Sequence, residues 1–130
     1  MPKFPKLFAG QNAACIISES DDFIAFLELK PLAIGHVVVT TKREEDDFFG
    51  LTDSELSKIM VFSKRIAVAL KKVVPCKKIG VAVLGLQLRQ AHVHLVPLQD
   101  ANDLNFTKDK LIVPTETLID LAVQIKILLK

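Results

Sequence analysis

Short apolar runs alternate with turn signals along the first third of the chain. Ala14 to Glu19 is rich in β-branched side chains and ends in a cluster of turn formers, after which a second apolar run, Phe23 to Leu27, begins directly. Because only a short connection separates them, these runs predict an antiparallel hairpin. Lys30-Pro31 then interrupts the pattern, Gly35 permits a turn, and His36 to Thr40 predicts a third strand.

The middle of the chain changes to helical periodicity. Thr52 is followed three residues later by Glu55, which is the capping-box pattern of a helix start, and Pro75 ends the periodic segment. Lysines are enriched in its last turn, where they favour the helix dipole. Apolar and small positions recur at spacings of three and four and predict one buried stripe: Leu56, Ile59, Met60, Ser63, Ala67, Leu70 and Val74.

The last third contains two further strand-like runs and a helix. Ile79 to Leu84 and Ala91 to Val96 are apolar, and the stretch from Gly85 to Arg89 separates them, which predicts a connected strand pair. Pro114-Thr115 opens a helix that continues to about Leu129. The order β-β-β-α-β-β-α predicts an α+β fold, with a mainly antiparallel five-stranded sheet and two helices on one side.

Length and composition bound the class of protein. The 130 residues are 50% apolar, with a mean hydropathy of +0.35, so the chain can bury enough surface to fold. We therefore expect a single domain over residues 1–130. Seventeen Lys and Arg against fifteen Asp and Glu leave a net charge of only +2, so we expect no nucleic-acid partner.

The compartment follows from cysteine usage and the lack of targeting patterns. Cys15 and Cys76 stand far apart and suggest no disulfide framework, which fits a reducing compartment. The N-terminal residues contain no continuous apolar core of a secretory signal. The apolar tail from Leu118 to Leu129 is interrupted by polar residues and is shorter than the roughly 20 residues of a membrane span. We expect a cytoplasmic protein that does not enter a membrane.

Candidate chemistry concentrates in the run from Gln90 to Pro97. Side chains alternate along a strand, so Gln90, His92 and His94 are predicted to share one face. Successive members are about 6.5–7 Å apart along the strand, close enough for two imidazoles to act on neighbouring atoms of one substrate. One ring could attack phosphorus while the next donates a proton to a leaving oxygen.

Two other interpretations of the histidine pair stay open at this point. His92 and His94 could line a solvated face of a half-buried strand. With His36 as a third ligand they could also form a zinc site, because neutral imidazole is a common metal ligand. No Cys, Asp or Glu lies at a compatible spacing next to the pair, so we expect no metal.

The same run resembles the signature of the histidine triad (HIT) family, in which three histidines alternate with apolar residues. Gln90 stands where the first triad histidine usually is, and Pro97 matches the proline that often follows. Three upstream blocks are similar to the family in the same order: Phe4 to Gly10, Phe23 to Leu29 and Pro31 to Val39. The resemblance extends from about Phe4 to Pro97.

The resemblance implies a fold, an assembly and a reaction. The family fold is an antiparallel sheet with two helices, usually as a homodimer, with a nucleotide site that uses no metal or other cofactor. His92 would attack the α-phosphorus of a nucleoside phosphoramidate, ester or dinucleotide, since neutral imidazole is a competent nucleophile near pH 7. His94 would hydrogen-bond the phosphate or the leaving-group oxygen. A backbone carbonyl would fix the tautomer of His92, and water would hydrolyse the nucleotidyl-histidine.

The resemblance also assigns residues that would bind a purine nucleotide or nucleoside phosphoramidate. Glu28 corresponds to the acid that accepts hydrogen bonds from the ribose hydroxyls. His36 would support the triad by hydrogen bonding, and Gly85 would allow a close backbone approach to the phosphate. Four side chains would form the apolar slot for the base, although each could equally belong to the core: Leu7, Phe8, Phe26 and Leu29.

Two departures from the family pattern leave two functions open. Gln90 cannot titrate, and the stretch from Val81 to Leu88 has no Asn and places Leu86 after Gly85, so phosphate contacts are fewer. The first hypothesis is a nucleotide hydrolase or nucleotidyl transferase with His92 as the nucleophile. The alternative is a nucleotide-binding or interaction protein of the same fold that has lost most turnover.

Overall fold

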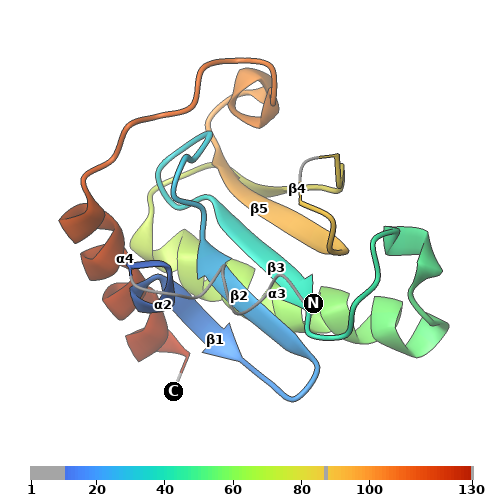
Figure 1. Cartoon of the computed structure of the whole chain (residues 1–130). Coiled ribbons are helices and arrows are strands. Elements are labelled where there is room, and N and C mark those ends of the chain that lie inside the picture. Colours follow the sequence, from blue (N-terminus) through green and yellow to red (C-terminus); the bar gives the residue numbers. More distant parts are fainter. Residues whose placement is uncertain (1–10, 87, 130) are drawn as a thin grey trace.

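Five strands form one antiparallel sheet in the computed structural model, which describes residues 11–86 and 88–129 (Figure 1). The spatial order of the strands is β1-β2-β3-β5-β4, so the third and fifth strands lie at the centre, side by side. The strands are β1 (Ile16–Glu19), β2 (Phe23–Leu27), β3 (Val37–Thr41), β4 (Lys78–Ala82) and β5 (His92–Leu98). The predicted antiparallel five-stranded sheet with two main helices is confirmed.

The two long helices begin where the sequence signals place them. Thr52 caps α3 (Asp53–Val73): its hydroxyl oxygen accepts from the Glu55 amide at 3.1 Å, and the Glu55 carboxylate accepts from the Thr52 amide at 2.9 Å. Pro114 precedes α4 (Thr115–Leu128). Three short helices were not predicted: α2 (Gln11–Ala14), η1 (Phe48–Gly50) and η2 (Ala101–Leu104). No helix of the described ranges is long and apolar enough to cross a membrane.

Alternation along the central strands separates the core from the opposite face of the sheet. Val37 and Val39 of β3, and Val93 of β5, belong to the core cluster that α3 and α4 complete. The residues between them, Val38 and His94, therefore point to the other face, where they are paired across the two strands. Both long helices contribute to this one core, which leaves the histidine face for a site.

The buried stripe of α3 is shifted relative to the prediction. Ile59, Ser63 and Leu70 are buried as expected, but Met60 is 42% exposed, and the remaining buried positions are Phe62, Ile66 and Ala69. Both sets satisfy spacings of three and four, so periodicity alone does not choose between them. The sheet decides, because Phe62 packs against Phe23 of β2 with ring centroids 5.7 Å apart.

After η2 the chain runs past the end of the sheet where β3 begins and β5 ends, and then enters α4 (Figure 1). The amide of Leu111 donates to the carbonyl of Pro31 at 2.8 Å, which fixes this connection to the loop between β2 and β3. The connection thereby brings residues 106–110 beside the central histidines.

Candidate active site

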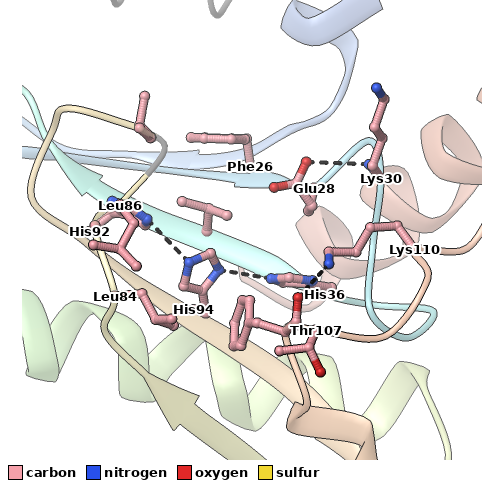
Figure 2. Close-up of a pocket in the computed structure, with 14 residues that line it drawn as sticks. Phe26, Glu28, Lys30, His36, Leu84, Leu86, His92, His94, Thr107 and Lys110 are labelled. Atoms are coloured by element: carbon pink, nitrogen blue, oxygen red, sulfur yellow. Dashed lines mark hydrogen bonds between the residues drawn. The ribbon is translucent and has the colours of Figure 1, made fainter.

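A cavity of about 410 Å³ opens on the histidine face of the sheet (Figure 2). Strands β2, β3 and β5 supply its floor, the loop after β4 one wall and the connection before α4 another. Fourteen residues line it: Phe26, Glu28, Lys30, His36, Val38, Leu84, Gly85, Leu86, Leu88, His92, His94, Phe106, Thr107 and Lys110.

The three histidines form a continuous chain of hydrogen bonds along this cavity. His36 Nε2 lies 2.9 Å from His94 Nδ1, and His94 Nε2 lies 3.1 Å from His92 Nε2. The chain ends on the main chain at both sides: the Leu32 amide lies 3.0 Å from His36 Nδ1, and the Gln90 carbonyl lies 2.5 Å from His92 Nδ1.

The hydrogen bonds to the main chain at the two ends of this chain of histidines require the same tautomer for each ring. An amide N–H only donates, so His36 Nδ1 accepts from Leu32 and Nε2 carries the proton given to His94. His94 then donates from Nε2 to His92 Nε2, and His92 donates from Nδ1 to the carbonyl of Gln90. A carbonyl only accepts, so this end requires the same direction. His92 therefore holds its Nε2 lone pair on the side of His94.

Burial keeps these imidazoles neutral. Desolvation lowers the pKa of His94 to about 3 and that of His36 to about 4, with further lowering from neighbouring positive charge. The pKa of His92 is also lowered, chiefly by desolvation, although its bond to the Gln90 carbonyl opposes the shift. At pH 7 the chain of histidines thus carries no charge, and the ring of His92 is available as a base or nucleophile.

Gln90 lies outside the cavity lining, although alternation predicts it on the same face as His92. Its buried side-chain amide donates to the carbonyls of Arg43 at 2.6 Å and Thr41 at 2.7 Å, beside the Thr41 hydroxyl at 3.2 Å. The side chain therefore ties the start of β5 to the end of β3. Its main-chain carbonyl, not its amide, reaches the histidines.

The other predicted residues divide into three groups. Phe26, Glu28, His36 and Gly85 line the cavity together with His92 and His94. Leu29 instead packs against the core cluster. Leu7 and Phe8 lie outside the described residues.

Sequence reasoning missed the wall formed by the connection before α4. The Phe106 ring stands edge-on to His94, with centroids 4.8 Å apart, and also meets His36 at 6.1 Å. Thr107 and Lys110 follow it in the lining. This segment has no apolar periodicity and no motif, so no sequence signal placed it at the site.

The three histidines are not arranged as a metal site. Across residues 11–86 and 88–129, no group of three or more His, Cys, Asp or Glu side chains is arranged to hold a metal ion. The ring nitrogens of all three histidines are engaged with one another or with the main chain.

The family profile of the HIT domain matches residues 9–101 of the chain. The chain belongs to the HIT domain family. The match includes every cavity residue contributed by β2, β3, β5 and the loop after β4, and it ends before Phe106.

Individual HIT proteins agree with this assignment. An uncharacterised HIT-like protein of Mycoplasma genitalium is 29% identical over 99 residues, covering 72% of this chain and 70% of that protein. A crystal structure of a HIT-like protein from Bartonella henselae has a TM-score of 0.73 at 26% identity, covering 87% of this chain and 84% of that chain. The asymmetrical bis(5'-nucleosyl)-tetraphosphatase of Schizosaccharomyces pombe is 28% identical over 93 residues, covering 65% of this chain and 51% of that enzyme.

Proposed function

We propose that this HIT domain is a nucleotide hydrolase or nucleotidyl transferase that acts at the α-phosphate of a nucleoside phosphoramidate, ester or dinucleotide. One observation carries the proposal: the tautomer of His92 leaves a lone pair on Nε2 inside the cavity, while Nδ1–H is held by the Gln90 carbonyl. A neutral imidazole in this form is a nucleophile at pH 7. The tetraphosphatase relative adds support for a nucleotide substrate.

Substrate binding would release this lone pair. In the structure, His92 Nε2 accepts a hydrogen bond from His94 Nε2–H at 3.1 Å. An anionic phosphate oxygen is a stronger acceptor than an imidazole nitrogen, so it would take over the proton of His94. His94 would then bind the phosphate, and His92 Nε2 would face the phosphorus.

The reaction itself takes two steps. His92 Nε2 forms a bond to the α-phosphorus while the bond from phosphorus to the leaving group breaks, and the leaving group departs with the electron pair. The leaving group takes a proton from His94 Nε2, which His94 regains from solvent, so His94 stays neutral while the nucleotidyl-His92 carries the positive charge of a substituted imidazolium. Water then attacks the phosphorus, the nucleoside monophosphate leaves with the hydroxyl of water, the other water proton returns to solvent, and His92 is neutral again. His36 keeps His94 oriented through its 2.9 Å bond.

The remaining roles concern substrate binding. Glu28 would accept hydrogen bonds from the ribose hydroxyls, and Phe26 would contact the base. Gly85 lines the cavity with its main chain in the left-handed region, at a φ of +74°. It would offer its backbone to the phosphate.

The alternative is a protein that binds nucleotide without turnover. It is favoured by the loop after β4, where Leu84 and Leu86 present apolar side chains to the cavity. Such side chains offer no hydrogen bond to a transition state whose charge grows on phosphate oxygens.

Hydrolysis of an adenosine monophosphate amidate by the wild type and His92→Gln distinguishes the two functions. Glutamine retains bulk in this buried position, so folding can be checked by thermal unfolding and nucleotide binding by calorimetry. We expect turnover by the wild type and background rates for His92→Gln, which has no nucleophile. Background rates of hydrolysis for both proteins, with nucleotide binding intact, would show that the natural protein is a binder.

We also propose a homodimer, as the resemblance implies. Strand β4 is an edge of the sheet, and apolar side chains are exposed on it and on α3, including Val81 at 48% and Val61 at 62%. A second copy would cover such surface. Light scattering at micromolar concentration should return about twice 14.4 kDa, and a monomer would contradict this assembly.

A further inference from the structure

One wall of the cavity lies beyond the part of the chain that matches the family. Phe106, Thr107 and Lys110 follow residue 101, where the match ends. Two contacts hold this wall in place: the Leu111 amide donates to the Pro31 carbonyl at 2.8 Å, and the Phe106 ring packs on His94. These contacts make the wall a fixed part of the cavity.

Lys110 presents a fixed and uncompensated positive charge on this wall. Its ammonium group donates to the carbonyl of Phe106 at 2.9 Å and to that of Lys108 at 3.2 Å, so one of its three protons remains for a ligand. Within the described part of the chain, no carboxylate oxygen lies within 4 Å of its nitrogen. The neighbouring Lys108 differs, because it pairs with Asp103 at 3.8 Å.

Lys110 is the cation of the cavity that a second phosphate could contact. The histidines are neutral at pH 7, and the side chain of Lys30 points away from the cavity in Figure 2, so the positive charge near the histidines comes from Lys110.

Lys110 is separated from the nucleophile. Figure 2 shows the chain of histidines with His92 at one end and Lys110 beyond His36 at the other. Successive ring centroids along this chain are 4.8 Å and 5.1 Å apart. An α-phosphate placed for attack by His92 therefore lies at the other end of the chain of histidines from the Lys110 ammonium.

We propose that Lys110 forms a subsite for a second phosphate group of the substrate, distinct from the α-phosphate that His92 attacks. This inference rests on the proposed nucleotide function and narrows it to nucleotides that carry at least two phosphates. The second phosphate can come from two places: the phosphate chain on the 5′ side, or a phosphate on the ribose, which Glu28 would hold at the same end of the cavity.

Calorimetric titration at low ionic strength tests the subsite with three probes. Adenosine monophosphate reports the basic nucleotide site, adenosine diphosphate adds a phosphate to the chain, and adenosine 2′,5′-bisphosphate adds one to the ribose. We expect at least one of the two larger ligands to bind the wild type about tenfold more tightly than the monophosphate. The ligand that gains identifies the source of the phosphate.

Three variants assign the effect to Lys110. Lys110→Met should abolish the advantage of the larger ligand over the monophosphate, and Lys110→Arg should retain most of it. Lys108→Met removes the same charge from the same segment outside the lining, so it should keep the advantage. Thermal unfolding checks that each variant folds.

The other outcomes would refute either the subsite alone or the subsite together with the nucleotide function. Equal affinity of the wild type for all three ligands, an advantage that survives in Lys110→Met, or one lost equally in Lys108→Met would refute the subsite and leave the proposed function intact. If the wild type binds none of the three ligands, the nucleotide function fails and the subsite fails with it.

Discussion

At the scale of single residues, Gln90 acts on the site through its main chain. Its carbonyl accepts from His92 Nδ1, and its side-chain amide donates to the carbonyls of Thr41 and Arg43. The amide therefore holds in place the carbonyl that sets the tautomer of the proposed nucleophile. A residue at this position can influence His92 without touching the substrate.

Replacement of Gln90 by His should change the rate much less than loss of the nucleophile. An imidazole N–H retains one donor for the carbonyls of residues 41 and 43, and the Gln90→His main chain still offers its carbonyl to His92. His92→Ala has no covalent route and should fall to background. Hydrolysis of an adenosine monophosphate amidate by the wild type and both variants measures this order. Activity that appears only in Gln90→His would show that the natural protein is a binder.

Gln90→Glu is the matched control because it keeps the shape of the side chain but removes the donor. An ionised carboxylate would face two carbonyl oxygens, and leaving them unpaired costs about 1–3 kcal/mol. We expect lower stability in urea and a lower rate than for Gln90→His. Equal stability of Gln90→Glu and the wild type would mean that the bonds to Thr41 and Arg43 contribute nothing.

Sequence patterns predict only part of this site. Alternation placed His92 and His94 together because it is a local property of one strand. It failed for the side chain of Gln90, since this residue precedes β5 and finds its acceptors at and just after the end of β3, more than 40 residues away in the chain. Phe106 and Lys110 lie at the cavity because their segment packs against the folded sheet, which is a tertiary contact that local sequence patterns do not predict.

At the scale of the elements, too, some features follow from local sequence and others from tertiary contacts. The capping box at Thr52 fixed the start of α3 from neighbouring residues, whereas the buried stripe of that helix depended on contact with β2. The turn before β3 depends on both. Gly35 has a φ of +93°, which local sequence permits, and it lies against Leu70 and Val74 at the end of α3. Its position decides where His36 enters the chain of histidines.

A pair of glycine variants separates backbone strain from packing. Gly35 and Gly85 both have positive φ, but a Cβ on Gly35 would lie 3.0–3.1 Å from Val74, Leu70 and Pro97, whereas a Cβ on Gly85 would meet nothing within 4 Å. Gly85→Ala should cost about 1 kcal/mol of unfolding free energy. Gly35→Ala should cost roughly 2–4 kcal/mol because overpacking is added to the strain. Urea unfolding measures both, and equal losses would contradict the packing argument.

At the scale of the whole molecule, three buried neutral histidines make stability depend on pH. In the unfolded chain each has a pKa near 6.5, whereas in the folded protein those of His36 and His94 lie at about 4 and 3. Between pH 6.5 and pH 4 the unfolded chain therefore binds more protons than the folded one, so stability falls as the pH falls. The slope is at most about 1.4 kcal/mol per pH unit for each histidine.

Urea unfolding between pH 7 and pH 4.5 should show this loss, and His36→Gln should reduce the slope. Glutamine can accept from the Leu32 amide and donate to His94, so it removes one titrating group from the chain of bonds. Carboxyl groups act at lower pH: hydrogen bonds from Arg43 lower the pKa of Glu55 from 4.5 to about 2, and main-chain amides lower that of Asp103 from 3.8. Above about pH 5.5, one unit over the unfolded-state pKa of Glu55, the slope thus reports the histidines. A flat profile in the wild type, or an unchanged slope in His36→Gln, would show that His36 is charged in the folded protein and that the neutral chain is wrong.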